Sequence, residues 1–200
     1  MKKLLRGALA ASLCGYICVN GLGCGGHDDD DHVHAPPSGA DTVIYEGGAT
    51  DEALGSIVGV TAKADDTRAA ALLAPTDGAV VPREPAPTFS WSTGTASASP
   101  RPRSRAWSPF EAERSAHAHG VAVTGVAYYL VLSTPKTPKL VEVLTTAQSW
   151  QPDAATWAKI TAEAAPVTAT LITARLEENR LAADGGPFAR TKALTFTVAP

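Results

Sequence analysis

Apolar and polar residues alternate in several segments after residue 70, and this period of two is typical of β-strands with one buried face. Turn residues such as Pro75, Asp77 and Gly78 separate these segments. The expected strands are residues 71–74, 88–92, 120–133, 140–146, 167–176 and 193–198. The side chains expected to point into the core are Phe89, Trp91, Tyr128, Leu130, Leu132 and Phe196.

The longest of these strands has two alternating sets of side chains. One set contains Tyr128 and the two leucines at 130 and 132. The other set, Tyr129, Val131 and Ser133, ends in a polar residue, so we expect the set of Tyr128 to face the core.

Two short helices are expected beside the strands. Thr50 has the character of an N-cap, and the acidic residues that follow it favour the positive end of a helix dipole. Leu54, Ile57 and Val58 would give this helix, residues 51–58, one apolar side that packs on the domain or on a partner. A second helix is expected from Asp153, as its cap, to residue 160.

The succession PTDGAVVP, PTFSW, AYYLVLS and ALTFTV resembles an immunoglobulin-like sandwich of the fibronectin type III sort, as found on bacterial surface lipoproteins. The resemblance covers residues 72–199. It implies a mainly β fold, an antiparallel β-sandwich with one or two short helices. It also implies that Trp91 is the core tryptophan of the second strand and that Tyr128 is its partner on the third. We expect this domain to span residues 71–200, with a long loop insertion at 92–120.

The first 24 residues have the pattern of an export signal. Lys2, Lys3 and Arg6 precede an apolar stretch, residues 8–19, that is shorter than a membrane span. The residues before Cys24 resemble the lipobox of bacterial lipoproteins, which implies a signal peptide at 1–23 and a lipid on Cys24. The glycine after Cys24 favours the outer membrane by the same resemblance. Secretion after ordinary cleavage at that bond, or an uncleaved anchor, are the alternatives.

Residues 24–70 are expected to form a flexible tether that carries the helix at 51–58. Their first part, GGHDDDDHVHAPPSGA, is rich in Asp, Gly and Pro and has no apolar pattern from which to build a core. Its imidazoles and carboxylates are also ligands that suit Zn²⁺ or Cu²⁺. The alternatives are therefore a solvated tail, weak adventitious binding, or a metal site that uses His27, His32 and His34.

The insertion contains a second set of candidate binding residues. Arg101, Arg103 and Arg105 flank Trp107, a combination that suits an acidic glycan or an anionic lipid head group. A solvated loop is the simpler interpretation. His117 and His119 would share one face of a strand, with Glu111 and Glu113 as the nearest further ligands, so they extend the metal hypothesis. Exposed or hydrogen-bonded histidines are the simpler interpretation.

Charge and motifs limit the functions to consider. The formal net charge is −3, and removal of the leader would make it about −6, which disfavours nucleic acid as a partner. All three cysteines lie within the first 24 residues. The sequence contains no phosphate loop, nucleophile elbow or HExxH motif, and we expect no cofactor and no catalytic residues. The leading hypothesis is a lipid-anchored envelope protein that binds a protein or glycan or acts as a spacer. The alternatives are a metal-binding lipoprotein and an accessory subunit of a surface enzyme or secretion complex.

Overall fold

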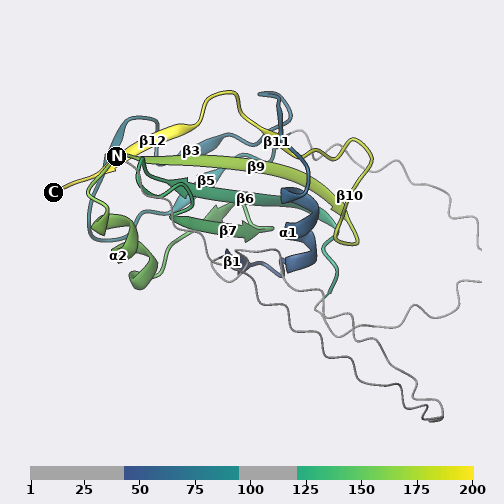
Figure 1. Cartoon of the computed structure of the whole chain (residues 1–200), viewed down its shortest axis with the longest axis horizontal. Coiled ribbons are helices and arrows are strands. Elements are labelled where there is room, and N and C mark those ends of the chain that lie inside the picture. Colours follow the sequence, from purple (N-terminus) through teal and green to yellow (C-terminus); the bar gives the residue numbers. More distant parts are fainter. Residues whose placement is uncertain (1–42, 95–120) are drawn as a thin grey trace, which may run out of the picture. The chain divides into compact units, whose positions relative to one another are not determined.

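The chain is mainly β in the computed structural model, which describes residues 43–94 and 121–200 (Figure 1). Two short helices accompany the strands of the described part. The helices are α1 (Asp51–Val58) and α2 (Ala154–Ala162). The strands are β1 (Val43–Glu46), β2 (Lys63–Ala64), β3 (Leu72–Ala74), β4 (Ala79–Val81), β5 (Phe89–Trp91), β6 (Gly125–Ser133), β7 (Val141–Thr145), β8 (Ser149–Trp150), β9 (Val167–Glu177), β10 (Arg180–Leu181), β11 (Phe188–Ala189) and β12 (Leu194–Val198).

The strands form one large sheet and one small sheet. The large sheet has the order β1-β7-β6-β9-β11-β2, and β10 and β12 also pair with β9. Strand β4 lies beside β12, and the small sheet has the order β3-β5-β8. Buried side chains of both sheets belong to one apolar cluster, so the two sheets pack face to face.

This cluster, the inner core, holds the side chains that alternation predicts to be inside. The ring centroids of Trp91 and Tyr128 are 5.6 Å apart. Phe89 lies 5.4 Å from Trp150 and 5.7 Å from Phe196 by the same measure. All six expected core residues are buried: Phe89, Trp91, Tyr128, Leu130, Leu132 and Phe196.

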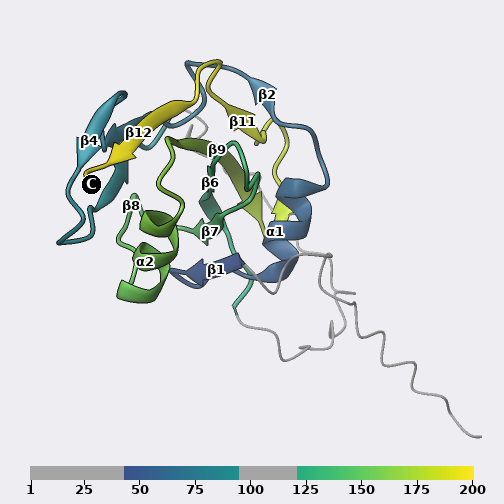
Figure 2. The same ribbon diagram turned by 60° about the vertical axis from the view of Figure 1, so that its left-hand side comes forward.

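The opposite face of the large sheet carries a second cluster, the outer core. Helix α1 contributes Leu54 and Ile57, which pack with Tyr129 of β6 and with apolar residues of β7 and β9. Figure 2 shows α1 and α2 on different sides of β6, β7 and β9. Tyr129 is therefore buried, contrary to the expectation that only the set of Tyr128 faces a core, because α1 covers the second face.

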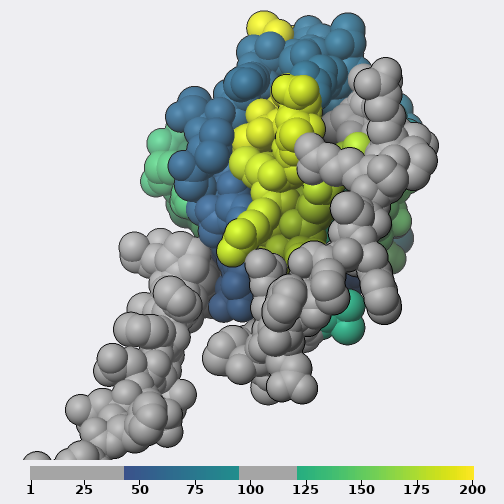
Figure 3. All heavy atoms as spheres, turned by 90° about the vertical axis from the view of Figure 1, so that its right-hand side faces the viewer, coloured from purple at the N-terminus to yellow at the C-terminus, as the bar shows by residue number. Residues whose placement is uncertain are grey.

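Residues 43–70, the N-terminal extension, are folded onto the sheet, so the structured region begins before the expected boundary at residue 71. Strand β1 pairs with β7, and β2 pairs with β11. On the surface in Figure 3, yellow residues from the C-terminal part lie beside blue residues from the extension. Residues 43–70 therefore do not form the expected flexible tether.

Strand direction also differs in part from the expected antiparallel arrangement. The pairs β1–β7, β2–β11 and β4–β12 are parallel, whereas the remaining pairs are antiparallel. Parallel neighbours require long connections rather than hairpins. The three strands β1, β2 and β4 all lie in the first half of the chain, far in sequence from their partners β7, β11 and β12, so the connections are long.

Both helices begin where their caps predict. The Thr50 side chain accepts a hydrogen bond from the Ala53 N–H, and the Asp153 side chain accepts one from the Thr156 N–H. Val58, expected on the apolar side of α1, is instead 45% exposed. Among the described residues, no helix has the length and apolar character needed to cross a membrane.

Candidate functional site

Most residues selected from the sequence as possible sites lie outside the described part of the chain. The structure therefore neither assembles nor separates them. They are the lipidation candidate Cys24, the metal candidates His27, His32, His34, His117 and His119, and the ligand-contact candidates Arg101, Arg103, Arg105 and Trp107. In residues 43–94 and 121–200, no group of three or more His, Cys, Asp or Glu side chains is placed to hold a metal ion.

A groove at the edge of the sandwich is the candidate site within the described residues. This edge groove has a volume of about 280 Å³ and lies between the segment that leads into β3 and the β9–β12 side of the large sheet. Its apolar lining consists of Ala70, Ala71, Leu72, Ala169, Leu171, Ala193 and Leu194. Its charged lining consists of Asp77, Arg190 and Lys192.

The edge groove forms where β9 changes its neighbour. Strand β11 pairs with β9 at Ile172 and Thr173, whereas β12 pairs with it only from Ala169 back to Val167. The chain between β11 and β12 carries the two cationic residues of the lining, Arg190 and Lys192, and it passes the part of β9 between these two pairings. Leu171 points inward from this part of β9, so apolar surface lies at the base of the groove.

One ion pair forms part of the rim. Lys192 Nζ lies 2.6 Å from Asp77 Oδ2, and the Thr195 N–H donates to Asp77 Oδ1 at 2.9 Å. The hydrogen bond from Lys192, followed by that from Thr195, lowers the pKa of Asp77 to about 2. The same bond to Asp77 raises the pKa of Lys192. Both groups are therefore charged at neutral pH.

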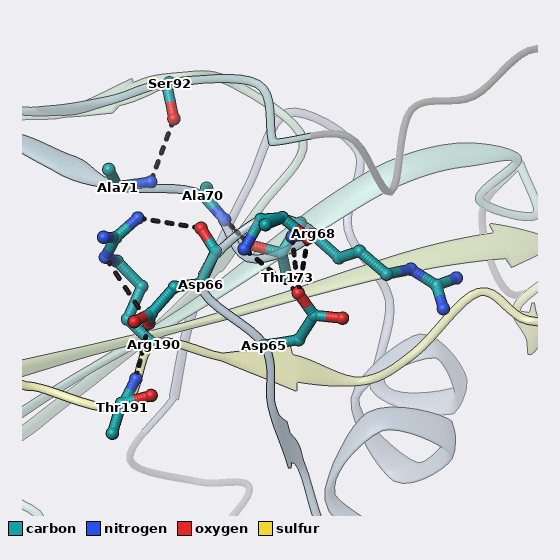
Figure 4. Close-up of polar contacts among 10 residues, drawn as sticks. Asp65, Asp66, Arg68, Ala70, Ala71, Ser92, Thr173, Arg190 and Thr191 are labelled. Atoms are coloured by element: carbon teal, nitrogen blue, oxygen red, sulfur yellow. Dashed lines mark hydrogen bonds and ion pairs between the residues drawn. The ribbon is translucent and has the colours of Figure 1, made fainter.

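A second charged contact joins the rim to the N-terminal extension (Figure 4). Arg190 donates from Nη1 to the Asp66 carbonyl at 3.1 Å, and its Nε lies 3.9 Å from Asp66 Oδ1. The same carboxylate oxygen accepts the Thr191 N–H at 2.8 Å. These contacts fix Arg190 and Thr191 against the extension.

The neighbouring turn is fixed by Asp65. Its Oδ1 accepts the N–H groups of Thr67 and Arg68, each at 3.0 Å. The Thr67 hydroxyl also bonds this carboxylate, and that bond is the largest cause of the lowered pKa of Asp65. The turn directs the chain so that the Ala70 N–H reaches the Thr173 hydroxyl at 2.9 Å. The segment before β3, which forms one wall of the edge groove, is therefore held by hydrogen bonds to the side chains of Asp65 and Thr173.

A wider groove of about 690 Å³ lies between α2 and the connection from β4 to β5. Trp157 lies at its base, and its indole N–H donates to the Arg83 carbonyl at 2.6 Å. Trp157 and Trp150 both belong to the inner core. Both residues are at most 5% exposed, so their rings pack in the core.

Within residues 43–94 and 121–200, Glu142 of β7 in the large sheet is the carboxylate that is buried, at 3% exposure. The Tyr129 hydroxyl donates to Glu142 Oε1, and Lys139 Nζ lies 2.8 Å from the same oxygen. Burial, then the hydrogen bond to Glu142, raises the pKa of Tyr129. This arrangement satisfies a buried charge beside the outer core, so its role is structural.

The residues of the edge groove were missed by sequence reasoning. Asp77 is visible only as part of a Pro-Thr-Asp-Gly turn, and Asp66, Arg190 and Lys192 lie in polar segments with no motif. They meet through contacts between residues more than 110 positions apart. No protein-family model, curated protein or solved structure matches this chain, so its site is argued from its own geometry.

Proposed function

We propose that this chain is an exported, lipid-anchored protein of the bacterial cell envelope whose immunoglobulin-like sandwich binds a partner molecule. The observation that carries the proposal is a sequence with the pattern of an export leader over residues 1–23, before Cys24, followed by a mainly β domain with an open groove at its edge. The fold supports a binding or spacer role because such sandwiches present stable surfaces on a rigid scaffold.

The distribution of strands supports the immunoglobulin-like part of the proposal. With the additions β1, β2, β4, β10 and β11 set aside, the first, second and fifth strands of the sandwich are β3, β5 and β8 in the small sheet. Its third, fourth, sixth and seventh strands are β6, β7, β9 and β12 in the large sheet. Fibronectin type III domains divide their seven strands in this way. The contact between Trp91 and Tyr128 agrees with the same resemblance.

The anchoring part of the proposal is tested by mass spectrometry of the mature N-terminus after expression in a bacterial host. We expect a chain that starts at Cys24, carries acyl groups and sediments with membranes. Cys24→Ala is expected to move the protein to the soluble fraction. Intact protein that retains Met1 in the soluble interior of wild-type cells would overturn the proposal.

The proposal that the sandwich binds a partner rather than catalyses a reaction is tested on the purified chain with panels of ester, glycoside and peptide substrates. We expect no turnover above that of a matched sample carrying Phe89→Ala, which removes a core ring. Turnover that is lost on substitution of a single carboxylate or histidine, with the fold retained, would contradict a binding role and indicate an enzyme.

A further inference from the structure

We infer that the edge groove binds an aliphatic monocarboxylate, with its hydrocarbon chain on the apolar lining and its carboxylate beside Lys192 and Arg190. This inference names a ligand class for the proposed binding role and rests on it. Three features of the groove carry it: the apolar base, the excess of cationic groups in the lining, and the volume.

The base of the groove accepts a hydrocarbon chain. Leu72 from β3 and Leu194 from β12 are half-buried and line the groove together with the buried Leu171 of β9. Small alanines at 70 and 169 complete the lining and leave the space open. Burial of each methylene there contributes to affinity through the hydrophobic effect.

The charges of the lining favour a negative head group. Lys192 and Arg190 are both part of the lining, whereas Asp77 is the one carboxylate that the described residues contribute to it. The Lys192 side chain is 82% exposed, and its ammonium group has three N–H donors, of which Asp77 needs one. The guanidinium of Arg190 has five donors and uses part of them on Asp66. Both cations can therefore donate to a ligand without leaving their partners.

A single negative charge fits better than two. Asp77 stays ionised at neutral pH because its pKa is about 2. Lys192 and Arg190 are each already paired with a carboxylate, Asp77 and Asp66, so little net positive charge remains to offset the desolvation of a ligand. That desolvation costs more for a phosphate dianion than for a carboxylate monoanion. The volume of about 280 Å³ lies just below the usual range of about 300–1,000 Å³ for small-molecule sites, which indicates a short or medium chain.

The test uses the full chain with Cys24→Ser, which removes the proposed acylation site and allows work without detergent. Octanoate is titrated into the isotope-labelled protein, and binding is followed by calorimetry and by the methyl resonances of Leu72, Leu171 and Leu194. We expect saturable shifts of these methyl groups. Acetate, which lacks the tail, and octylamine, which carries the opposite charge, are expected to bind at least roughly tenfold more weakly. Added salt is expected to weaken octanoate binding.

Two variants locate the site. Lys192→Gln is expected to weaken octanoate binding roughly fivefold, because it removes one exposed charge interaction. Lys136→Gln removes an exposed lysine that is not part of the groove and should leave binding unchanged. Ala193→Leu fills the groove from its half-buried wall and should abolish binding. Thermal unfolding of each variant shows whether the fold is retained.

The inference fails if octylamine binds as well as octanoate, if the groove methyl groups do not shift, or if Lys192→Gln and Ala193→Leu both bind like the parent protein. Such a result leaves the anchoring proposal intact when Cys24 is acylated in cells. Conversely, specific octanoate binding by a chain that is never acylated would support the groove and overturn the anchor.

Discussion

The two faces of the large sheet are covered in different ways. The inner face meets a second sheet, and its core is rich in aromatic rings, among them Phe89, Trp91 and Tyr128. The outer face meets one short helix, and its core is mostly aliphatic. The inner face is thus covered by strands of the sandwich itself, whereas the outer face depends on the N-terminal extension.

This difference shows how a short segment can complete a sheet. Strand β7 is buried along all five of its residues, and β6 is buried on both faces from Ala127 to Leu130. A strand buried on both faces reads as a nearly continuous apolar run rather than as an alternation. The run AYYLVL therefore indicates a strand that is covered on both faces. The N-terminal extension supplies the cover of the outer face.

The two cores can be compared by the stability lost when one side chain is removed from each, and we expect the greatest loss for an aromatic ring of the inner core. Phe89→Ala deletes a side chain that is 0% exposed and lies between Trp150 and Phe196. We expect the free energy of unfolding to fall by about 3–5 kcal/mol, because a cavity remains between two sheets that cannot close on it. Urea denaturation measures this loss.

The matched control on the small sheet is Leu73→Ala. Leu73 lies in β3 of the same sheet but is 57% exposed, so the change is expected to stay within about 0.5 kcal/mol. Equal losses for Phe89→Ala and Leu73→Ala would contradict the assignment of Phe89 to the core.

The outer core is tested by Ile57→Ala in α1. Ile57 is 1% exposed and packs on the large sheet, so we expect a loss of about 2–3 kcal/mol in the free energy of unfolding. The expected loss lies toward the low end of the range for Ile→Ala substitutions, because a short surface helix can shift to fill part of the cavity. Its neighbour Val58 is 45% exposed, and Val58→Ala should change stability by less than about 0.5 kcal/mol.

Hydrogen exchange on Ile57→Ala shows whether the N-terminal extension and the sandwich unfold together. If the extension and the sandwich unfold together, amides of α1 and β6 lose protection by the same amount. If only the amides of α1 and β1 exchange faster while β6 is unchanged, the outer core opens as a separate unit. That second result would contradict a single cooperative domain.

The turn after β9 joins the extension to the outer core through Asn179. Its side-chain Oδ1 accepts the Thr50 hydroxyl at 3.0 Å and the Val123 N–H at 2.7 Å. Its carbonyl accepts the Ser56 hydroxyl at 2.7 Å, and its φ is 64°. Asn179→Gly keeps this backbone conformation while removing the side-chain bonds, so we expect a loss of about 1–2 kcal/mol in thermal or urea unfolding.

The adjacent residue provides the control for Asn179→Gly. Glu178 also has a positive φ, 50°, but it is exposed and only its backbone N–H is bonded, to Thr124. Glu178→Gly should therefore change stability by less than about 0.5 kcal/mol. A larger loss for Glu178→Gly than for Asn179→Gly would show that the chain flexibility added by glycine, rather than the loss of the asparagine amide, accounts for the effect.

Local signals in the sequence predicted a good part of this structure. Helix α1 was expected at residues 51–58 and lies there, because Thr50 and the acids after it act within one turn. The alternation of Phe89 with Trp91 likewise needs only neighbouring residues. The pairing of β1 with β7 joins residues about 100 positions apart, and no local pattern encodes it. The edge groove was missed for the same reason.

The smallest expected effect concerns the rim of the edge groove and its dependence on pH. The pKa of Asp77 is lowered to about 2, chiefly by Lys192, from about 3.9 in an unfolded chain. A depressed folded pKa contributes stability that is present above about pH 4 and is lost as pH falls toward 2. The difference in urea midpoint between wild type and Asp77→Asn should therefore shrink between pH 6 and pH 2.5. In a Lys192→Gln background the difference should be smaller at every pH. A difference that does not change with pH would show that this ion pair contributes nothing to folding.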